Sequence, residues 1–550
     1  MTPTAPRPSE PLADLRAELA AAATTLRPGG VALDGAPRLE RPPRPELGDY
    51  SSNLAMLLAP VLRASPRDVA ERLGVALAER LGASLSRVEA AGPGFLNLFL
   101  TDAWCLDALA SVLSAGSEWG RGAPGAGRVL VEFVSANPTG PVTVASGRHA
   151  AYGDALARIL EAAGHEVARE YYVNDHGSQV QRFGESIRAR ARGEDPPPDG
   201  YRGAYVTDLA EALPGAAEAE PDDLARAGVA RMVTAIGGSL MRYRVFFDAF
   251  FSERSLYESG AVERVIATLE ERGLVFTSEG ATWLRTTRFG DDKDRVLRRS
   301  SGEYTYFASD IAYHEDKRAR GVDLAVDVLG ADHHGYVGRM RAAWQALGGE
   351  PEALELPIMQ LVNLTERGQR VAMSKREGEF VTLDELMDDI GVDAARFFLL
   401  QRSHDTTLDL DLALARDQSQ DNPVYYVQYA HARIASILRR AGIERVEAAL
   451  AADLSASLER FHPSARALLA LLLALPDEVA FAAERRAPHR MTTYATEVAQ
   501  GFSAFYRDCK VVGAAEEGGD EDVRLALCVV AGRVIATALG LLGVEAPGEM

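Results

Sequence analysis

The feature that most constrains the fold is an apolar segment that turns into a helix. Residues 128–135 read RVLVEFVS, which has the composition of a buried strand. Two prolines and a glycine follow, and residues 148–164 then carry an apolar face at helical spacing. Further strand candidates at residues 169–175, 322–330 and 356–364 alternate with helical stretches. The middle of the chain is therefore predicted to be an α/β core with a parallel sheet.

The turn after the first strand is a candidate anion site. A helix N-terminus at the carboxyl end of a parallel strand presents unpaired backbone N–H groups and the positive end of the helix dipole. Gly140 and Gly147 allow a ligand to approach this backbone closely. The turn contains neither a P-loop nor a dinucleotide fingerprint. A strand–helix turn without a ligand is therefore the alternative interpretation.

A second loop, at residues 370–386, has the sequence RVAMSKREGEFVTLDEL. It follows the strand candidate at residues 356–364, which we expect to return to the same sheet edge. Only four of the 59 basic residues in the chain are lysines, and Lys375 is one of them. Lysine and arginine differ in shape and phosphate geometry, so this lysine indicates a place where arginine would not serve. Solvated surface is the alternative, but two phosphate-competent turns in one core predict a site for a polyphosphate such as ATP.

Composition limits the setting and the partners. The formal net charge of −20 argues against a non-specific nucleic-acid binder, although a local basic patch remains compatible with it. The three cysteines form no C-x-x-C pair or disulfide framework, which favours a reducing, cytoplasmic setting. The longest apolar run, residues 467–476, is too short to cross a bilayer, and the N-terminus lacks the pattern of a secretion signal. We therefore expect no membrane partner.

The chain divides into three regions. A Gly-rich stretch at residues 114–128 separates a first region, which mixes helical patterns with a strand at residues 94–100, from the α/β core. Strand signals stop after about residue 408, and the rest reads as helices. The sequence predicts a small α+β domain, an α/β core with an insertion, and a helical C-terminal domain.

Seven stretches give the chain a family resemblance. They are VEFVSANPTGP, REYYVNDHG, FSERSLYESG, GDDKDRVLRRSSGEYTYFASDIAYH, GADHHGYV, MSKREGEFVTL and DNPVYYVQYAHAR. In this order they resemble the arginyl-tRNA synthetases, which are class I aminoacyl-tRNA synthetases, over nearly the whole chain. The resemblance implies an N-terminal tRNA-binding domain (1–115), a Rossmann-like catalytic domain (128–405) with an insertion at about 177–300, and an all-helical anticodon-binding domain (406–550).

The first signature of this family departs from its usual form. Relatives read His-x-Gly-His after the proline, whereas this chain has Thr143, Val144, Ala145 and Ser146. Thr143 and Ser146 keep a hydroxyl donor at each place, but they cannot become cations. Replacing two charge-assisted hydrogen bonds by neutral ones costs roughly 1 kcal/mol each, which slows activation by about one to two decades. We therefore expect attenuation and not abolition. In the second signature, Ala372 replaces the usual first lysine.

Site residues follow from matching positions. The resemblance implies that Lys375, Ser374, Thr143 and Ser146 are catalytic. It implies that ATP contacts Gly140, Gly147, Arg148, Met373 and Lys375. It implies that arginine contacts Glu132, Ser135, Asn137, Tyr306, Asp310 and His333. It implies that tRNA contacts Phe95, Asn97, Tyr425, Tyr429 and Arg433.

Some of these assignments have independent chemical support. Tyr306 and Asp310 are four residues apart, so on a helix both project to one face, and a carboxylate matches a guanidinium. Without the resemblance, a core tyrosine and a capping aspartate would be the preferred interpretation. The tyrosines near residue 425 and Arg433 provide rings and a cation for unstacked bases, although at least one of these tyrosines is expected to be core. The DHHGY stretch that contains His333 lacks further ligand candidates nearby, so no protein-bound metal is predicted.

The predicted function is that of an arginine-tRNA ligase. Such an enzyme forms arginyl-adenylate from L-arginine and ATP, with Mg²⁺ arriving with the ATP, and then transfers arginine to the 3′ end of tRNA(Arg). Activation is expected to require bound tRNA, and a cytoplasmic monomer is expected. The alternative is a silent or attenuated paralogue that acts as a tRNA-binding or regulatory protein. The missing histidines favour the alternative, while the arginine-binding residues, Lys375 and the tRNA-binding regions favour the enzyme.

Overall fold

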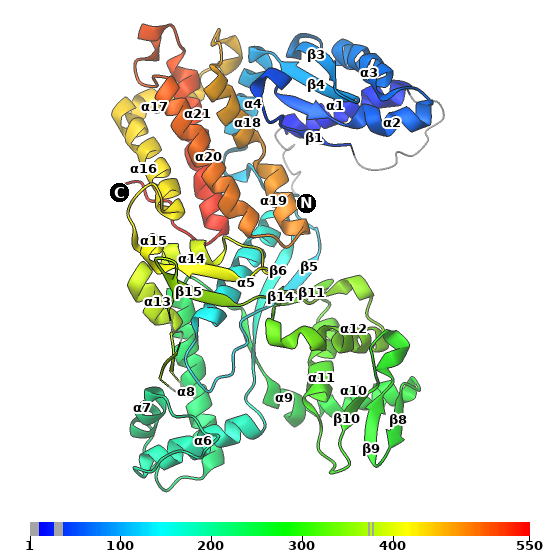
Figure 1. Cartoon of the computed structure of the whole chain (residues 1–550), viewed down its shortest axis with the longest axis vertical. Helices are drawn as coiled ribbons and strands as arrows, with labels where there is room; N and C mark the ends of the chain where they lie inside the picture. Colours follow the sequence, from blue (N-terminus) through cyan, green and yellow to red (C-terminus); the bar gives the residue numbers. More distant parts are fainter. Residues whose placement is uncertain (1–9, 27–36, 372–373, 377–378) are drawn as a thin grey trace, which may run out of the picture.

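The structure is a computed structural model that describes residues 10–26, 37–371, 374–376 and 379–550. Its parts are visible in Figure 1: an N-terminal domain in blue, a central sheet, two lobes below that sheet, and a helical bundle at the C-terminal end. This arrangement confirms the predicted fold class, with a parallel-sheet core between a small α+β domain and a helical domain.

The N-terminal domain is an antiparallel sheet covered by helices. Its helices are α1 (Pro11–Leu26), α2 (Leu54–Leu62) and α3 (Pro66–Leu81). Its strands are β1 (Leu39–Glu40), β2 (Tyr50–Ser52), β3 (Leu85–Ala91) and β4 (Phe95–Leu100), in the order β1-β2-β4-β3. Leu96, Leu98 and Leu100 project to one face of β4 and are buried, because successive strand side chains alternate between faces. Helix α4 (Asp102–Ala115) leads from this domain to the core.

The core is a five-stranded parallel sheet. Its strands are β5 (Arg128–Glu132), β6 (Glu166–Val173), β7 (Ala249–Ser252), β11 (Leu324–Asp327) and β13 (Leu354–Glu355). They lie in the order β13-β11-β5-β6-β7, and every neighbouring pair is parallel. Helix α5 (Val144–Ala162) connects β5 to β6. The predicted strand–turn–helix unit is therefore confirmed, with the helix starting four residues earlier than the apolar pattern indicated.

The strand predicted at residues 356–364 does not join this sheet, so that prediction was wrong. It divides into β14 (Ile358–Met359), which pairs with β12 (Leu329–Gly330), and β15 (Val362–Glu366). Strand β15 pairs with β16 (Gln369–Arg370) and with β19 (Leu408–Asp411). Between β14 and β15, the carbonyl oxygens of Gln360 and Leu361 accept hydrogen bonds from Arg148, and the Leu361 carbonyl also accepts from the backbone N–H of Leu408 at the start of β19. An apolar pattern cannot reveal this long-range partner.

Two lobes interrupt the sheet on the side opposite the bundle (Figure 1). The first comprises α6 (Ser178–Ala191), α7 (Ala204–Ala212) and α8 (Pro221–Arg242). The second comprises α9 (Glu253–Glu258), α10 (Ala261–Glu271), β8 (Val275–Ser278), β9 (Ala281–Leu284), β10 (Arg295–Arg298), α11 (Tyr306–Ala319) and α12 (Val337–Ala346). Strand β7 returns to the sheet between the two lobes, so the predicted insertion at about residues 177–300 is not one continuous excursion.

Helices dominate the chain after β15. A short hairpin of β17 (Ser374–Arg376) and β18 (Glu379–Phe380) precedes α13 (Leu383–Ile390), α14 (Val392–Leu399) and α15 (Leu412–Arg416). The bundle contains α16 (Pro423–Ala441), α17 (Ile443–Ala451), α18 (Pro463–Leu473), α19 (Leu475–Glu484), α20 (His489–Asp508) and α21 (Glu521–Leu541). Asn422 caps α16, with its Oδ1 accepting from the backbone N–H of Val424, and Pro423 is the first helical residue.

One helix of the bundle is unusually apolar. Among the described residues, α21 alone is long and apolar enough to cross a membrane by length and composition. Its most apolar window is 67% buried inside the protein, where it packs beside α16, α17 and α20. This burial is typical of the core helix of a bundle.

Candidate active site

The carboxyl end of β5 leads into a strained turn. Val134 and Ser135 adopt φ angles of 68° and 38°, which non-glycine residues rarely do and which are frequent at functional sites. The Ser135 hydroxyl donates to Glu132 Oε1 at 2.9 Å and accepts from the backbone N–H of Tyr172 at 3.1 Å. Ser135 thereby fixes the Glu132 carboxylate and ties the end of β5 to β6.

The start of α5 lies against the C-terminal part of the second predicted loop. Thr143 is the N-cap of α5, and its Oγ1 accepts from the backbone N–H of Ser146 at 3.3 Å. The two hydroxyl oxygens are also 3.3 Å apart. Val144 N–H donates to the Val381 carbonyl at 3.2 Å, and Leu383 N–H donates to the Val142 carbonyl at 2.8 Å. These backbone bonds bring the two predicted phosphate-binding segments side by side.

Glycine at position 147 serves this packing. A Cβ atom there would lie 2.8 Å from Leu383 Cδ1 on α13, which is too close for a normal contact. A Cβ at Gly140 would meet Tyr205 Oη at 3.4 Å, so space alone does not require glycine at that position. Ser374 and Lys375 lie in β17, while Met373 lies outside the described residues.

Arg148 is an internal support, which contradicts its predicted contact with ATP. Its side chain is 1% exposed. Nη1 donates to the Gln360 carbonyl at 2.7 Å, and Nη2 donates to the carbonyls of Ser403 and Thr406 at 2.9 Å each. Burial lowers the pKa of Arg148 to about 10. Because its donors are directed at carbonyl groups, the guanidinium holds the loops before β15 and β19 against α5.

The N-terminal turns of α11 carry the predicted arginine-binding pair. Tyr306 and Asp310 lie on this helix, as their spacing predicted, and Tyr306 is 51% exposed at a cavity of about 770 Å³ between the two lobes. Tyr257 and His176 also line this cavity, with their rings stacked 4.2 Å apart. The Tyr336 hydroxyl donates to Asp310 Oδ2.

Two carboxylates of this site, Asp310 and Glu253, have no cationic partner among the described residues. Burial, followed by the charges of Glu253 and Glu132, raises the pKa of Asp310 well above its ordinary value. Glu253, at the start of α9, is buried and accepts from Ser309 Oγ at 3.0 Å. Burial raises the pKa of Glu253 to about 7. Within the part of the chain that the structure describes, neither Asp310 nor Glu253 forms an ion pair, so the site has the electrostatic character of a cation-binding pocket.

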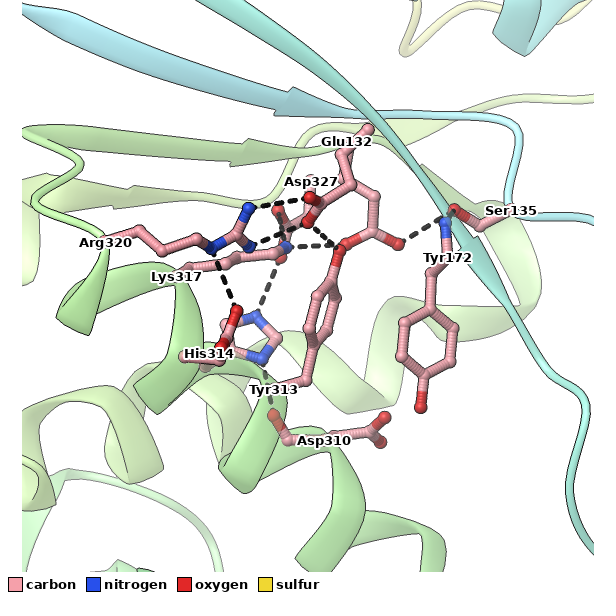
Figure 2. A network of polar contacts seen from close by, with 11 residues as sticks. Glu132, Ser135, Tyr172, Asp310, Tyr313, His314, Lys317, Arg320 and Asp327 are labelled. Carbon is pink, nitrogen blue, oxygen red and sulfur yellow. Dashed lines mark hydrogen bonds and ion pairs between the residues drawn. The ribbon is translucent and has the colours of Figure 1, made fainter. Parts of the chain in front are cut away.

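Glu132 belongs to a buried ionic network (Figure 2). Its Oε2 accepts from Lys317 Nζ at 2.6 Å, and Lys317 Nζ also donates to Asp327 Oδ1 at 2.7 Å. Asp327 Oδ2 is 2.7 Å from His314 Nε2, and His314 Nδ1 is 2.7 Å from the Asp310 carbonyl oxygen. Both ring nitrogens of His314 therefore face acceptors, and both bonds form only when each nitrogen carries a proton. Burial opposes ionisation of Asp327, but Lys317 and His314 outweigh it and lower the pKa of Asp327 below its ordinary value.

A second arm of the network binds Glu170 of β6. Arg320 donates to both Glu170 oxygens at 2.7 and 2.9 Å, and the Tyr313 hydroxyl donates to Oε1 at 2.7 Å. One sequence signal could have indicated the network: lysine is rare in this chain, and Lys317 is one of the four lysines. We found no sequence signal for Glu170, Glu253 or Asp327.

Two further predicted arginine-binding residues are exposed near this site. Asn137 Oδ1 accepts from Asn174 Nδ2 at 3.3 Å, and His333 Nδ1 is 3.1 Å from Asp332 Oδ1. Their contact with a substrate stays a prediction. The described residues contain no group of three or more His, Cys, Asp or Glu side chains that could hold a metal ion.

An aromatic and basic surface runs along α16. The rings of Tyr425 and Tyr429 are stacked with centroids 6.2 Å apart, and Arg433 lies 4.7 Å over the ring of Tyr429. Arg433 also lies 5.4 Å from the ring of Tyr506 on α20. This surface borders a groove of about 1010 Å³ that includes three arginines that the sequence reasoning did not single out. They are Arg439, Arg440 and Arg507. Tyr426 instead donates to Ser503 inside the bundle, as expected for at least one tyrosine.

The two predicted tRNA-binding residues on β4 differ in exposure. Phe95 is 38% exposed, whereas Asn97 is 4% exposed and accepts from the Ser51 hydroxyl at 2.8 Å. The burial of Asn97 contradicts a direct surface contact, and its amide instead joins β4 to β2. Arg87 lies 3.6 Å over the ring of Phe99 on the same sheet.

Comparisons with known proteins match the whole arrangement. The family models that match are the arginyl tRNA synthetase N terminal domain over residues 13–100, the class I (R) tRNA synthetase catalytic domain over 108–189 and 226–426, and the DALR anticodon binding domain over 427–550. A solved putative arginyl-tRNA synthetase from Campylobacter jejuni is 33% identical, with a TM-score of 0.76, covering 82% of this chain and 100% of that one.

Two other solved structures extend over nearly the full chain. The arginyl-tRNA synthetase of Thermus thermophilus is 25% identical, with a TM-score of 0.78, covering 98% of this chain and 100% of that one. The enzyme of the same name from Plasmodium falciparum is 16% identical, with a TM-score of 0.75, covering 99% of this chain and 100% of that one. The last likeness concerns the fold alone.

Proposed function

The chain belongs to the arginyl-tRNA synthetase family, and on that premise we infer that it is an arginine-tRNA ligase. It activates L-arginine with ATP, releases diphosphate, and transfers arginine to the 3′ end of tRNA(Arg). Class I chemistry needs no covalent enzyme intermediate, because orientation of the reactants and charge stabilisation are sufficient. The replaced signature histidines, at Thr143 and Ser146, favour a silent tRNA-binding paralogue, but neither the comparisons nor the geometry of the described residues adds support to that alternative.

The observation that best supports arginine as the substrate is the cluster of carboxylates around α11. Glu253 is buried and Asp310 is half-buried, neither forms an ion pair with another described residue, and Tyr306 provides an exposed ring beside them. A guanidinium would neutralise these carboxylates and donate several hydrogen bonds in fixed geometry. We propose that Asp310 binds the guanidinium and that Glu132, Ser135, Asn137 and His333 complete the arginine site.

ATP is proposed to lie between the start of α5 and the β17–β18 hairpin. The backbone N–H groups of the first turn of α5 and the hydroxyls of Thr143 and Ser146 would receive the phosphates, with Gly140 and Gly147 beside them. Lys375, with Ser374 and Met373, would supply the second side of this site, and Mg²⁺ would accompany the nucleotide. Arg148 is left out, because its guanidinium already donates to the protein. We propose that activation requires bound tRNA.

Contacts with tRNA are proposed for both ends of the protein. Phe95 on the N-terminal sheet would contact the body of the tRNA, while Tyr425, Tyr429 and Arg433 would receive anticodon bases, since stacked rings and a guanidinium suit unstacked bases. We propose the domain division 1–115, 128–405 and 406–550, with the insertion at about 177–300 divided by strand β7 of the core sheet. A cytoplasmic monomer is proposed as the working state.

Arginine binding is tested by calorimetry with the uncharged analogue citrulline, which has nearly the shape of arginine. Binding of arginine at least about a hundredfold tighter than citrulline is expected, because the carboxylates require a cation. Asp310→Asn should remove most of this preference. Equal affinity for the two ligands in the parent protein would contradict the proposed site.

A further inference from the structure

A fully buried lysine connects the two carboxylate residues proposed to bind arginine. Glu132 lies at the end of β5, and Asp310 lies on α11. Figure 2 shows Lys317 reaching between Glu132 and Asp327, with His314 continuing toward Asp310. We infer that Lys317 is a positioning residue for arginine activation, which fixes the Glu132 carboxylate and holds α11 at the end of the sheet. The inference rests on the proposed function, because that function places arginine at this site.

The connection is continuous and consists of short polar contacts. Lys317 Nζ is 2.6 Å from Glu132 Oε2 and 2.7 Å from Asp327 Oδ1. Asp327 Oδ2 is 2.7 Å from His314 Nε2, and His314 Nδ1 is 2.7 Å from the carbonyl oxygen of Asp310. Three elements meet in this chain of contacts: β5, β11 and α11. Lys317 is the one member that bonds to both strands.

The environment of Lys317 explains why arginine does not occupy this position. The Lys317 side chain is 0% exposed, and the ring of Tyr313 lies 4.2 Å from Nζ. A compact ammonium can direct its hydrogens at two carboxylates and a ring, whereas the planar guanidinium is larger and needs a wider space. In a chain with 59 basic residues of which four are lysines, this retained lysine matches the geometry of its pocket.

Burial of these charges does not by itself favour folding. A buried ion pair stabilises a protein little or not at all compared with apolar residues of the same volume, because desolvation offsets the attraction. Its effect on the site is direct, however. Ser135 holds one Glu132 oxygen and Lys317 holds the other, so the remaining lone pairs point in fixed directions. Loss of Lys317 would free Glu132 and leave Asp327 without its main counter-ion.

The test uses the full-length protein and separates arginine from ATP. Lys317→Met should raise the KM for arginine roughly ten- to a hundredfold, because a fixed charge-assisted contact loses its orientation. The KM for ATP should stay within about twofold, since no part of the network lies in the proposed ATP site. Lys293→Met is the matched control, because Lys293 is an exposed lysine of the second lobe, and it should change neither constant.

Two further variants distinguish positioning from support of the fold. In Lys317→Met/Asp327→Asn the buried unpaired carboxylate is gone, so the thermal midpoint should recover while the KM for arginine stays high. Recovery of both values would overturn the inference.

If neither Lys317 variant folds, Asp327→Asn alone decides, since it keeps the shape of the side chain. This variant should raise the KM for arginine while the KM for ATP stays unchanged, and an unchanged KM for arginine would overturn the inference. A parent protein that does not charge tRNA would refute the proposed function instead.

Discussion

At the scale of single residues, the site combines excess carboxylate with strained backbone. Asp310 and Glu253 come from α11 and α9, and burial holds the pKa of each above its ordinary value. The family resemblance indicated Asp310, and its spacing from Tyr306 agreed with that role, but nothing in the sequence indicated Glu253, because a glutamate in a short helix is usually exposed. Only the fold brings the two side chains together.

These carboxylates predict a pH dependence of arginine binding. The pKa of Glu253 is raised to about 7, so below that pH the side chain is protonated in the free protein, and a guanidinium must displace the proton. Affinity for arginine should therefore rise as the pH increases from 5.5 to about 7 and then level off. Asp175 and Tyr172 also face Glu253, so Glu253→Gln is needed to assign the step, which it should remove. Calorimetry across this pH range measures the affinity for arginine. An affinity that does not change with pH in the parent protein would contradict the assignment.

The replaced signature residues predict two separable defects. Thr143→Ala removes the N-cap of α5 and should lower the free energy of unfolding by about 1 kcal/mol, whereas Thr143→Ser should retain it. Ser146→Ala keeps the cap and should leave stability nearly unchanged. Both alanine variants should slow arginine-dependent pyrophosphate exchange, because each loses a donor near the phosphates. Full exchange activity in both alanine variants would mean that the backbone N–H groups of α5 bind the phosphates without help from the two hydroxyls.

At the scale of elements, α5 links the turn after β5 to loops that are distant in sequence. The sequence predicted the helix and its strand well, because both have long, regular apolar patterns. The sequence could not predict the partners of Arg148. A basic residue near a helix N-terminus is equally consistent with a phosphate contact and with carbonyl contacts inside the protein. The same long-range bonds explain why the strand predicted at residues 356–364 is divided.

Arg148 is therefore expected to affect stability more than ATP binding. The Arg148 guanidinium donates to three carbonyl groups at 2.9 Å or less, and in Arg148→Met these carbonyl groups lose their donor. The variant should therefore lower the free energy of unfolding by about 2–4 kcal/mol. The control Arg67→Met removes an exposed arginine that pairs with Glu71 and should cost less than about 0.5 kcal/mol. Urea denaturation gives both values. A lower ATP affinity with unchanged stability would restore the predicted phosphate contact.

At the scale of the whole molecule, the N-terminal domain and the segment that follows it are fixed to the bundle. Arg466 on α18 donates to Asp49 at 3.1 Å and to Asp102 at 2.6 Å. Trp119 Nε1 donates to the Leu472 carbonyl at 3.0 Å. The order of the domains could be predicted from the sequence, because composition changes at their junctions. Their contacts could not be predicted, because each depends on one polar pair far apart in the chain.

The whole molecule also resolves the apparent conflict between net charge and a nucleic-acid partner. The chain carries a net charge of −20, yet Arg433, Arg439, Arg440 and Arg507 line one groove of the bundle. A local cationic and aromatic surface on an acidic protein can bind one nucleic acid selectively while repelling others. The acidic background is therefore compatible with tRNA as the partner.

The most direct test of the account is aminoacylation by the purified, full-length protein. The reaction contains ATP, Mg²⁺, radiolabelled arginine and a transcript of tRNA(Arg), and the product is acid-precipitable arginyl-tRNA. We expect several molecules of arginyl-tRNA to form per molecule of protein, despite Thr143 and Ser146 in the first signature, and we expect Asp310→Asn to abolish nearly all of this product. A protein that binds the transcript in a gel-shift assay but forms no arginyl-tRNA would contradict the ligase activity.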